Sequence, residues 1–116
     1  MTSGRLKTLI DGQITADFMA TESEEKLMSA LKNIFPDISA EKKACTLEGH
    51  AGLSRFKELA EKEQILAAVE SILDDNVDGD ISYIDLNKIA ALAGRIGIDE
   101  GSPIGKIRLS VPWKKA

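Results

Sequence analysis

Alternation of apolar and polar side chains marks three segments of the chain as strands. In residues 12–20, GQITADFMA, apolar side chains take every second position from Ile14 to Phe18. A period of two is typical of a strand with one buried face. The same period predicts a short strand at 44–50, ACTLEGH, and another at 106–111, KIRLSV.

Two longer segments instead repeat apolar residues every three or four positions, which is the pattern of an amphipathic helix. The first opens with TESE, a capping box in which the Thr21 hydroxyl accepts a hydrogen bond from the backbone N–H of Glu24. Pro36 stops this helix, because proline cannot continue the hydrogen-bond ladder. The second helix is predicted to begin at Ser54 and to run as one long element to Leu73.

The remaining segments are predicted to be two strands, a connection and a tail. The two strands are ISYIDL at 81–86 and GRIGI at 94–98. The polar connection is ISAEKKA at 38–44, and the loose tail is PWKKA at 112–116. Two amphipathic helices need a common surface on which to bury their apolar faces. We therefore predict an α+β fold, with an antiparallel sheet of about five strands and both helices on one face, and expect residues 1–116 to form a single domain.

Composition narrows the function classes. The formal net charge is −4, so any nucleic-acid binding must come from a local patch rather than from the field of the whole protein. Cys45 is the single cysteine, which excludes an internal disulfide and favours a reducing cytoplasm. The start of the sequence shows no apolar signal segment, and no run approaches the length of a membrane span. A cytoplasmic protein is expected.

The segment DDNVDGDISYID, residues 74–85, has the spacing of a calcium-binding loop, with a glycine at the position of the sharp turn. Its twelfth position is an aspartate, one methylene shorter than the glutamate that usually clamps the ion, and the chain has no second loop to pair with it. The sequence NVDGD is also ordinary turn chemistry. The candidate oxygen ligands are Asp74, Asn76, Asp78, Asp80 and Asp85.

Three longer stretches resemble a known family. The stretches are ATESEEKLMSALKNIFPD at 20–37, GLSRFKELAEKEQILAAVESIL at 52–73 and LNKIAALAGRIGIDEGSPIGKIRLSV at 86–111. In this order they are similar to uncharacterised protein family 0201 of archaea. The resemblance covers about 14–111 and implies a fold like that of the large-subunit ribosomal protein that binds the five-S RNA. It also implies a grouping with archaeal RNA-binding proteins, among them a predicted exosome subunit. It further implies that 74–85 is a variable connection and not a metal site.

A helix-free sheet face would leave basic side chains accessible. By alternation Lys106, Arg108 and Arg95 point to that face, and Lys88 is placed at its rim. Lysine and arginine bind RNA by neutralising phosphates and releasing counterions. These four residues are the predicted RNA-binding site, and Tyr83 is a candidate for stacking on a base. The alternative interpretation is that they are solvated positions on an exposed face.

No catalytic constellation is present in the sequence. His50 and Cys45 lie five residues apart in a predicted strand, hence on opposite faces, and cannot act together as base and nucleophile. We expect a non-enzymatic protein with no cofactor, no resident metal and no membrane partner, which binds RNA weakly. The alternative is a homodimeric protein–protein interaction module that pairs through the free sheet face or an edge strand.

Overall fold

Five strands form one antiparallel sheet in the order β2-β3-β1-β5-β4. The computed structural model describes residues 9–17, 23–43, 46–99 and 106–113. Within them the strands are β1 Asp11–Asp17, β2 Ser39–Lys43, β3 Thr46–Gly52, β4 Ile81–Asn87 and β5 Lys106–Pro112. The predicted α+β class and the five-stranded antiparallel sheet are confirmed.

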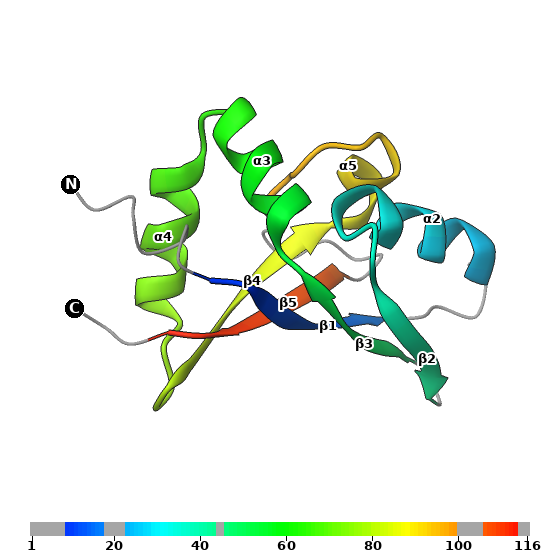
Figure 1. Ribbon diagram of the computed structural model, residues 1–116, viewed down its shortest axis with the longest axis horizontal. Coiled ribbons are helices and arrows are strands. Elements are labelled where there is room, and N and C mark those ends of the chain that lie inside the picture. Colours follow the sequence, from blue (N-terminus) through cyan, green and yellow to red (C-terminus); the bar gives the residue numbers. More distant parts are fainter. Residues whose placement is uncertain (1–8, 18–22, 44–45, 100–105, 114–116) are drawn as a thin grey trace.

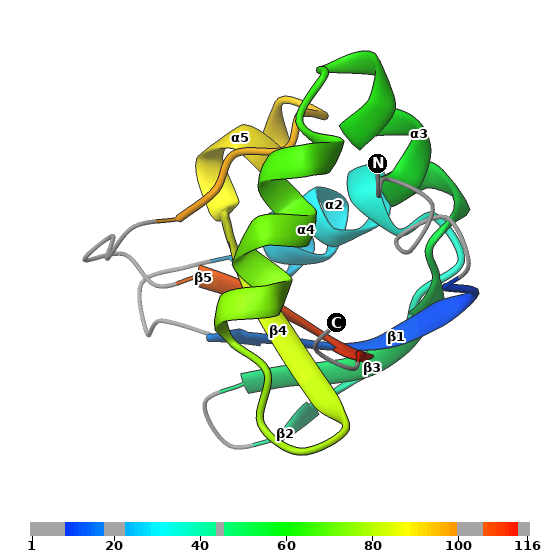
Figure 2. The ribbon, with the colours of Figure 1, turned by 90° about the vertical axis from the view of Figure 1, so that its left-hand side faces the viewer.

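The helices lie on one side of this sheet (Figures 1 and 2). Across the described ranges there are four of them rather than the two predicted, and none is long and apolar enough to cross a membrane. Helices α2 and α5 pack against each other, and α4 packs along β4. The helices are α2 Glu24–Ile34, α3 Ser54–Lys62, α4 Leu66–Asp75 and α5 Lys88–Leu92.

The hydrophobic core fills the space between the sheet and the helices. Ile14 of β1 faces Leu109 of β5 in register, and both side chains are fully buried or nearly so. Above the sheet, the rings of Phe35 and Phe56 stack with centroids 6.0 Å apart and planes 16° from parallel. Removal of this apolar surface from water is the main force that holds helices to the sheet.

In the part of the chain that the structure describes, no helix lies on the other side of the sheet (Figure 1). We call this surface the open face; it consists of the odd-numbered residues of β1, β2 and β4 and the even-numbered residues of β3 and β5. Burial alternates along β1, β3, β4 and β5 with a period of two, as expected for strands with one buried face and one solvent-exposed face. Most side chains of the open face are polar or charged.

The predicted second helix is wrong as a single element, because it is interrupted between α3 and α4. Gln64 adopts the left-handed conformation with φ 59°. The N–H of Ile65 donates to the carbonyl of Ala60, and the N–H of Gln64 donates to that of Glu61. This is the pair of hydrogen bonds that closes a helix in the Schellman motif, a position usually held by glycine.

Three further segments differ from the sequence-based expectation. Residues 39–43, predicted as a connection, form the edge strand β2. Residues 94–98, predicted as a strand, make only an isolated bridge between Ile98 and Leu86 along the outer edge of β4. Trp113, placed in a loose tail by the sequence, is 4% exposed.

Helix α2 begins later than the capping box predicts. Ser23 is its N-cap, and the Ser23 hydroxyl oxygen accepts a hydrogen bond from the backbone N–H of Lys26 at 3.3 Å. Thr21, the predicted cap, lies outside the described residues, as do Phe18 and Cys45.

Candidate functional site

Arg108 lies on the open face, on the strand next to the edge strand β4, and is held there by two neighbours on β4. Its Nε and Nη2 donate to the two carboxylate oxygens of Asp85 at 2.8 and 3.1 Å. Its guanidinium carbon lies 4.0 Å from the centroid of the Tyr83 ring. A two-pronged pair with a carboxylate fixes the orientation of the guanidinium, and contact with an aromatic face adds a cation–π attraction.

The register of the two strands produces this arrangement. Arg108 of β5 stands directly opposite Asp85 of β4, and Tyr83 is opposite Ser110, one step along the same face. Directly paired side chains on one face of a sheet are about 5 Å apart, and diagonal neighbours remain within reach of long side chains. The hydrogen bond to Asp85 raises the pKa of Arg108 above its ordinary value, so the guanidinium is charged at every working pH.

The side chain of Arg108 is nevertheless accessible. It is 41% exposed, whereas that of Asp85 is 19% exposed. Asp85 and Tyr83 therefore support the guanidinium from one side and leave part of it open to solvent. We call Arg108, Tyr83 and Asp85 together the arginine platform.

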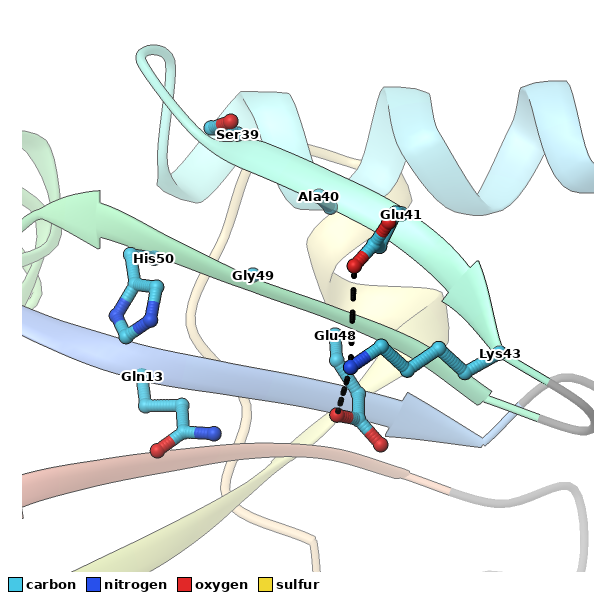
Figure 3. A pocket seen from close by; sticks show the side chains of 8 residues that line it. All are labelled: Gln13, Ser39, Ala40, Glu41, Lys43, Glu48, Gly49 and His50. Atoms are coloured by element: carbon cyan, nitrogen blue, oxygen red, sulfur yellow. Dashed lines mark ion pairs between the residues drawn. The ribbon is translucent and has the colours of Figure 1, made fainter.

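Polar side chains continue across the open face from the platform. Thr15 of β1 is opposite Arg108, and Gln13 is opposite Ser110. Next to them is a shallow hollow of about 440 Å³ over β1, β2 and β3. Figure 3 shows Gln13 and His50 side by side in this hollow, with Lys43 between Glu41 and Glu48. The side chains that line the hollow include Gln13, Ser39, Glu41, Lys43, Glu48 and His50.

The charge of the open face is acidic on balance. Its described basic residues are Lys43, Lys106 and Arg108. Its described acidic residues are Asp11, Asp17, Glu41, Glu48 and Asp85. Two of the three cations are also engaged with carboxylates, Arg108 with Asp85 at 2.8 Å and Lys43 with Glu41 and Glu48 at 3.8 Å.

The four residues predicted to contact RNA do not gather in one place. Lys106 and Arg108 share the open face, as their alternation predicts. Lys88 is 4% exposed and its ammonium donates to the backbone carbonyl of Asp17, so it is buried rather than at a rim. Arg95 is exposed in the irregular segment that follows α5, not on a strand.

Sequence analysis did not single out Asp85, Gln13, Thr15 or Ser110 as neighbours of Arg108. Alternation alone places each of them on the correct face of its strand. The missing information was the register between strands, which brings these residues to the same place.

The residues with calcium-loop spacing are not arranged around one centre. Asp74 lies in α4 and accepts a hydrogen bond from Trp113 Nε1 at 2.9 Å, and Asp85 lies in β4, paired with Arg108. The side-chain amide of Asn76 donates to the Tyr83 carbonyl at 3.0 Å. Within the described ranges, no three histidine, cysteine, aspartate or glutamate side chains form a group that could hold a metal ion. Residues 74–85 form a helix end, a tight turn and a strand.

The geometry defines an α+β protein with one sheet face under helices and the other open. No protein-family model matches the sequence. A UPF0201 protein of Thermococcus kodakarensis is 30% identical over 110 residues, covering 88% of this chain and 80% of the relative. A UPF0200/UPF0201 protein of Archaeoglobus fulgidus is 33% identical over 109 residues, which are 91% of this chain and 34% of that longer protein. The chain thus spans about a third of the Archaeoglobus protein.

Among solved structures, the crystal structure of a UPF0201 protein matches with a TM-score of 0.81 and 30% identity, over 92% of this chain and 85% of the other. The chain belongs to the UPF0201 family of archaeal proteins. The names of these relatives state no activity and no ligand.

Proposed function

We propose that this protein is a non-enzymatic RNA-binding protein that contacts RNA through its open face. The observation that carries the proposal is the arginine platform: an arginine held in a fixed orientation over an aromatic ring, on a sheet surface that no helix covers. Arginine planes and aromatic rings on open surfaces are the groups on which proteins stack the bases of RNA. The resemblance to a fold of ribosomal RNA-binding type, and the grouping with exosome-related proteins that it implies, belong to this proposal.

The neighbours of His50 support the non-enzymatic part of the proposal. His50 lies opposite Ser39 and Gln13 in the register of the sheet. A catalytic histidine and serine need a hydrogen bond between them and a group that orients the imidazole. In the described part of the chain, no hydrogen bond joins His50 to Ser39. His50 instead lines the hollow of the open face, beside Gln13 and Ser39.

Removal of the two cations on β5 tests the proposed function. We expect labelled RNA with unpaired segments to bind the wild-type protein at about 50 mM salt, and the Lys106→Ala/Arg108→Ala variant to bind at least tenfold more weakly, since loss of one stacked base alone costs about 1–3 kcal/mol. Fluorescence anisotropy measures both affinities.

A matched control is Lys26→Ala/Lys32→Ala, which removes the same charge from exposed positions of α2 on the helix side. It should bind RNA nearly as the wild type does. The proposal fails if the wild-type protein binds no RNA at this salt, or if both double variants behave alike.

Homodimer formation, the alternative from the sequence, stays a prediction. Strand β2 is the edge to which a second copy could add a strand, because residues 97–99 occupy part of the outer edge of β4. Glu41, Lys42 and Lys43 are exposed on β2. Charged side chains on an edge strand are the usual protection against such pairing. RNA binding is therefore the better supported function, and light scattering of the purified protein decides on the dimer.

A further inference from the structure

We infer that the open face takes an unpaired nucleobase of RNA, stacked on the guanidinium of Arg108, and that it selects RNA through the base rather than through phosphate charge. The inference rests on the proposed function and specifies the chemistry of the same surface. It differs from the phosphate contacts that the basic residues suggest when only the sequence is known.

The first argument is preorganisation. An arginine that reaches for phosphate is flexible and gives up rotamer freedom when it binds. Arg108 is already ordered by Asp85, whose two carboxylate oxygens accept hydrogen bonds from two of its N–H groups. It is also ordered by the Tyr83 ring, whose centroid lies 4.0 Å from the guanidinium carbon. A group that is ordered before the ligand arrives loses little entropy on binding. What Arg108 presents to solvent is therefore a fixed cationic plane backed by an aromatic ring.

The second argument is electrostatic. The charge that Arg108 would offer a phosphate is offset by the carboxylate of Asp85, and Lys43 is similarly placed between Glu41 and Glu48. Since the described carboxylates of the open face outnumber its cations, phosphates gain little there by counterion release. A nucleobase carries no formal charge and is not repelled. Stacking is the interaction that this charge balance leaves available.

The third argument concerns the edge of the bound base. Going from Arg108 toward β3, the register brings first Thr15 and then Glu48, and Gln13 stands beside Thr15. Neighbouring strands are about 4.8 Å apart, so Glu48 lies two strands or about 10 Å from Arg108. A purine stacked on Arg108 extends over Thr15 and Gln13, toward the hollow shown in Figure 3.

These side chains favour bases that carry an amino group. The Gln13 amide can donate one hydrogen bond and accept another, the pairing that glutamine makes with adenine. The Glu48 carboxylate can only accept hydrogen bonds; adenine offers it an exocyclic amino group with two N–H donors, whereas uracil offers only its ring N–H. The expected order therefore places adenine ahead of uracil.

Two substitutions separate stacking from phosphate binding, because the two modes of binding predict different affinities for each variant. Arg108→Lys keeps the positive charge but loses the planar group and the two-pronged pair. Asp85→Ala removes a negative charge and frees Arg108. If Arg108 binds phosphate, the lysine variant keeps its affinity and the alanine variant binds RNA more tightly. If Arg108 stacks on a base, both variants bind more weakly.

The experiment uses anisotropy with three labelled probes: a short oligoadenylate, an oligouridylate of equal length, and the oligoadenylate with its bases removed at central positions. We expect the abasic probe to bind the wild-type protein roughly tenfold more weakly than oligoadenylate, with oligouridylate in between. We expect Arg108→Lys and Asp85→Ala each to lose roughly tenfold on oligoadenylate. Circular dichroism and melting curves check that the variants are folded, and the abasic comparison needs no variant.

The inference is overturned, with the proposed function intact, if the abasic probe binds as well as oligoadenylate, or if Arg108→Lys binds normally and Asp85→Ala binds more tightly. If none of the probes and no structured RNA binds at low salt, the proposed function and the inference are both overturned.

Discussion

Phe56→Ala is expected to lower the free energy of unfolding by about 3–5 kcal/mol, the usual cost of removing a buried aromatic ring. Phe56 of α3 is fully buried and stacks on the ring of Phe35, which follows α2. The loss combines apolar surface removed from the core with the cavity that remains. It is a large part of the 5–15 kcal/mol that is typical of a small protein.

Urea unfolding followed by circular dichroism measures this effect. Ile89→Ala is the matched control, because Ile89 is a large apolar residue of α5 that is 63% exposed. Its replacement should change the unfolding free energy by about 0.5 kcal/mol or less. Similar losses in the two variants would mean that Phe56 of α3 is not part of the hydrophobic core in the way described.

Trp113→Ala is the second substitution with a large expected effect, again about 3–5 kcal/mol. The Trp113 side chain is 4% exposed, and its indole Nε1 donates to the carboxylate of Asp74 at the end of α4. Its backbone N–H donates to the carbonyl of Asp80 at 2.9 Å. Trp113 thus joins the end of β5 to both ends of the turn between α4 and β4.

Trp113→Phe separates packing from hydrogen bonding, because phenylalanine keeps an apolar ring but has no N–H to donate. We expect it to cost about 1–3 kcal/mol, less than alanine. Since Asp74 is engaged with Trp113, added calcium should leave the melting temperature of the wild-type protein unchanged. A negligible effect of Trp113→Ala on stability would support the loose tail that the sequence suggests. A calcium-dependent rise in melting temperature would support the calcium loop.

The parts of the fold that were predictable are those in which one face of an element is buried. β1, β3 and β5 alternate because each has helices on one side only, and their period of two is visible in the sequence. Helix α2 buries Leu27, Leu31 and Ile34 on one stripe, which gives the helical period. Periodicity reports burial, so these elements could be located from the sequence.

The elements that were missed lack such a signal or depend on distant contacts. β2 is an edge strand exposed on nearly every residue, so SAEKK shows no apolar alternation. The end of α3 uses Gln64 in a left-handed conformation, where the sequence offers no glycine or proline as a marker. By contrast α5, which ends at Leu92, is followed by Gly94 with φ 75°, and glycine is the usual residue just beyond a helix C-cap. That glycine could have indicated a helix that ends just before the predicted strand at 94–98.

The sheet face that carries the candidate site was predictable from the sequence, but the neighbours of each site residue were not. Alternation correctly places Lys106 and Arg108 on one face of β5. The partners of Arg108 depend on the pairing of β4 with β5, and the burial of Lys88 depends on a carbonyl 71 residues away in the chain. Register and long-range packing are set by the whole fold, so local sequence patterns do not contain them.

Backbone and side-chain chemical shifts of isotope-labelled protein, followed by NMR as oligoadenylate is added, test the central claim most directly. The account predicts that the largest changes occur at Gln13 and Thr15 of β1, at Ser110 of β5 and at the Nε–H group of Arg108. The helix side of the protein should change little. Shifts concentrated on α2 and α5, with the Arg108 Nε–H resonance unmoved, would contradict it.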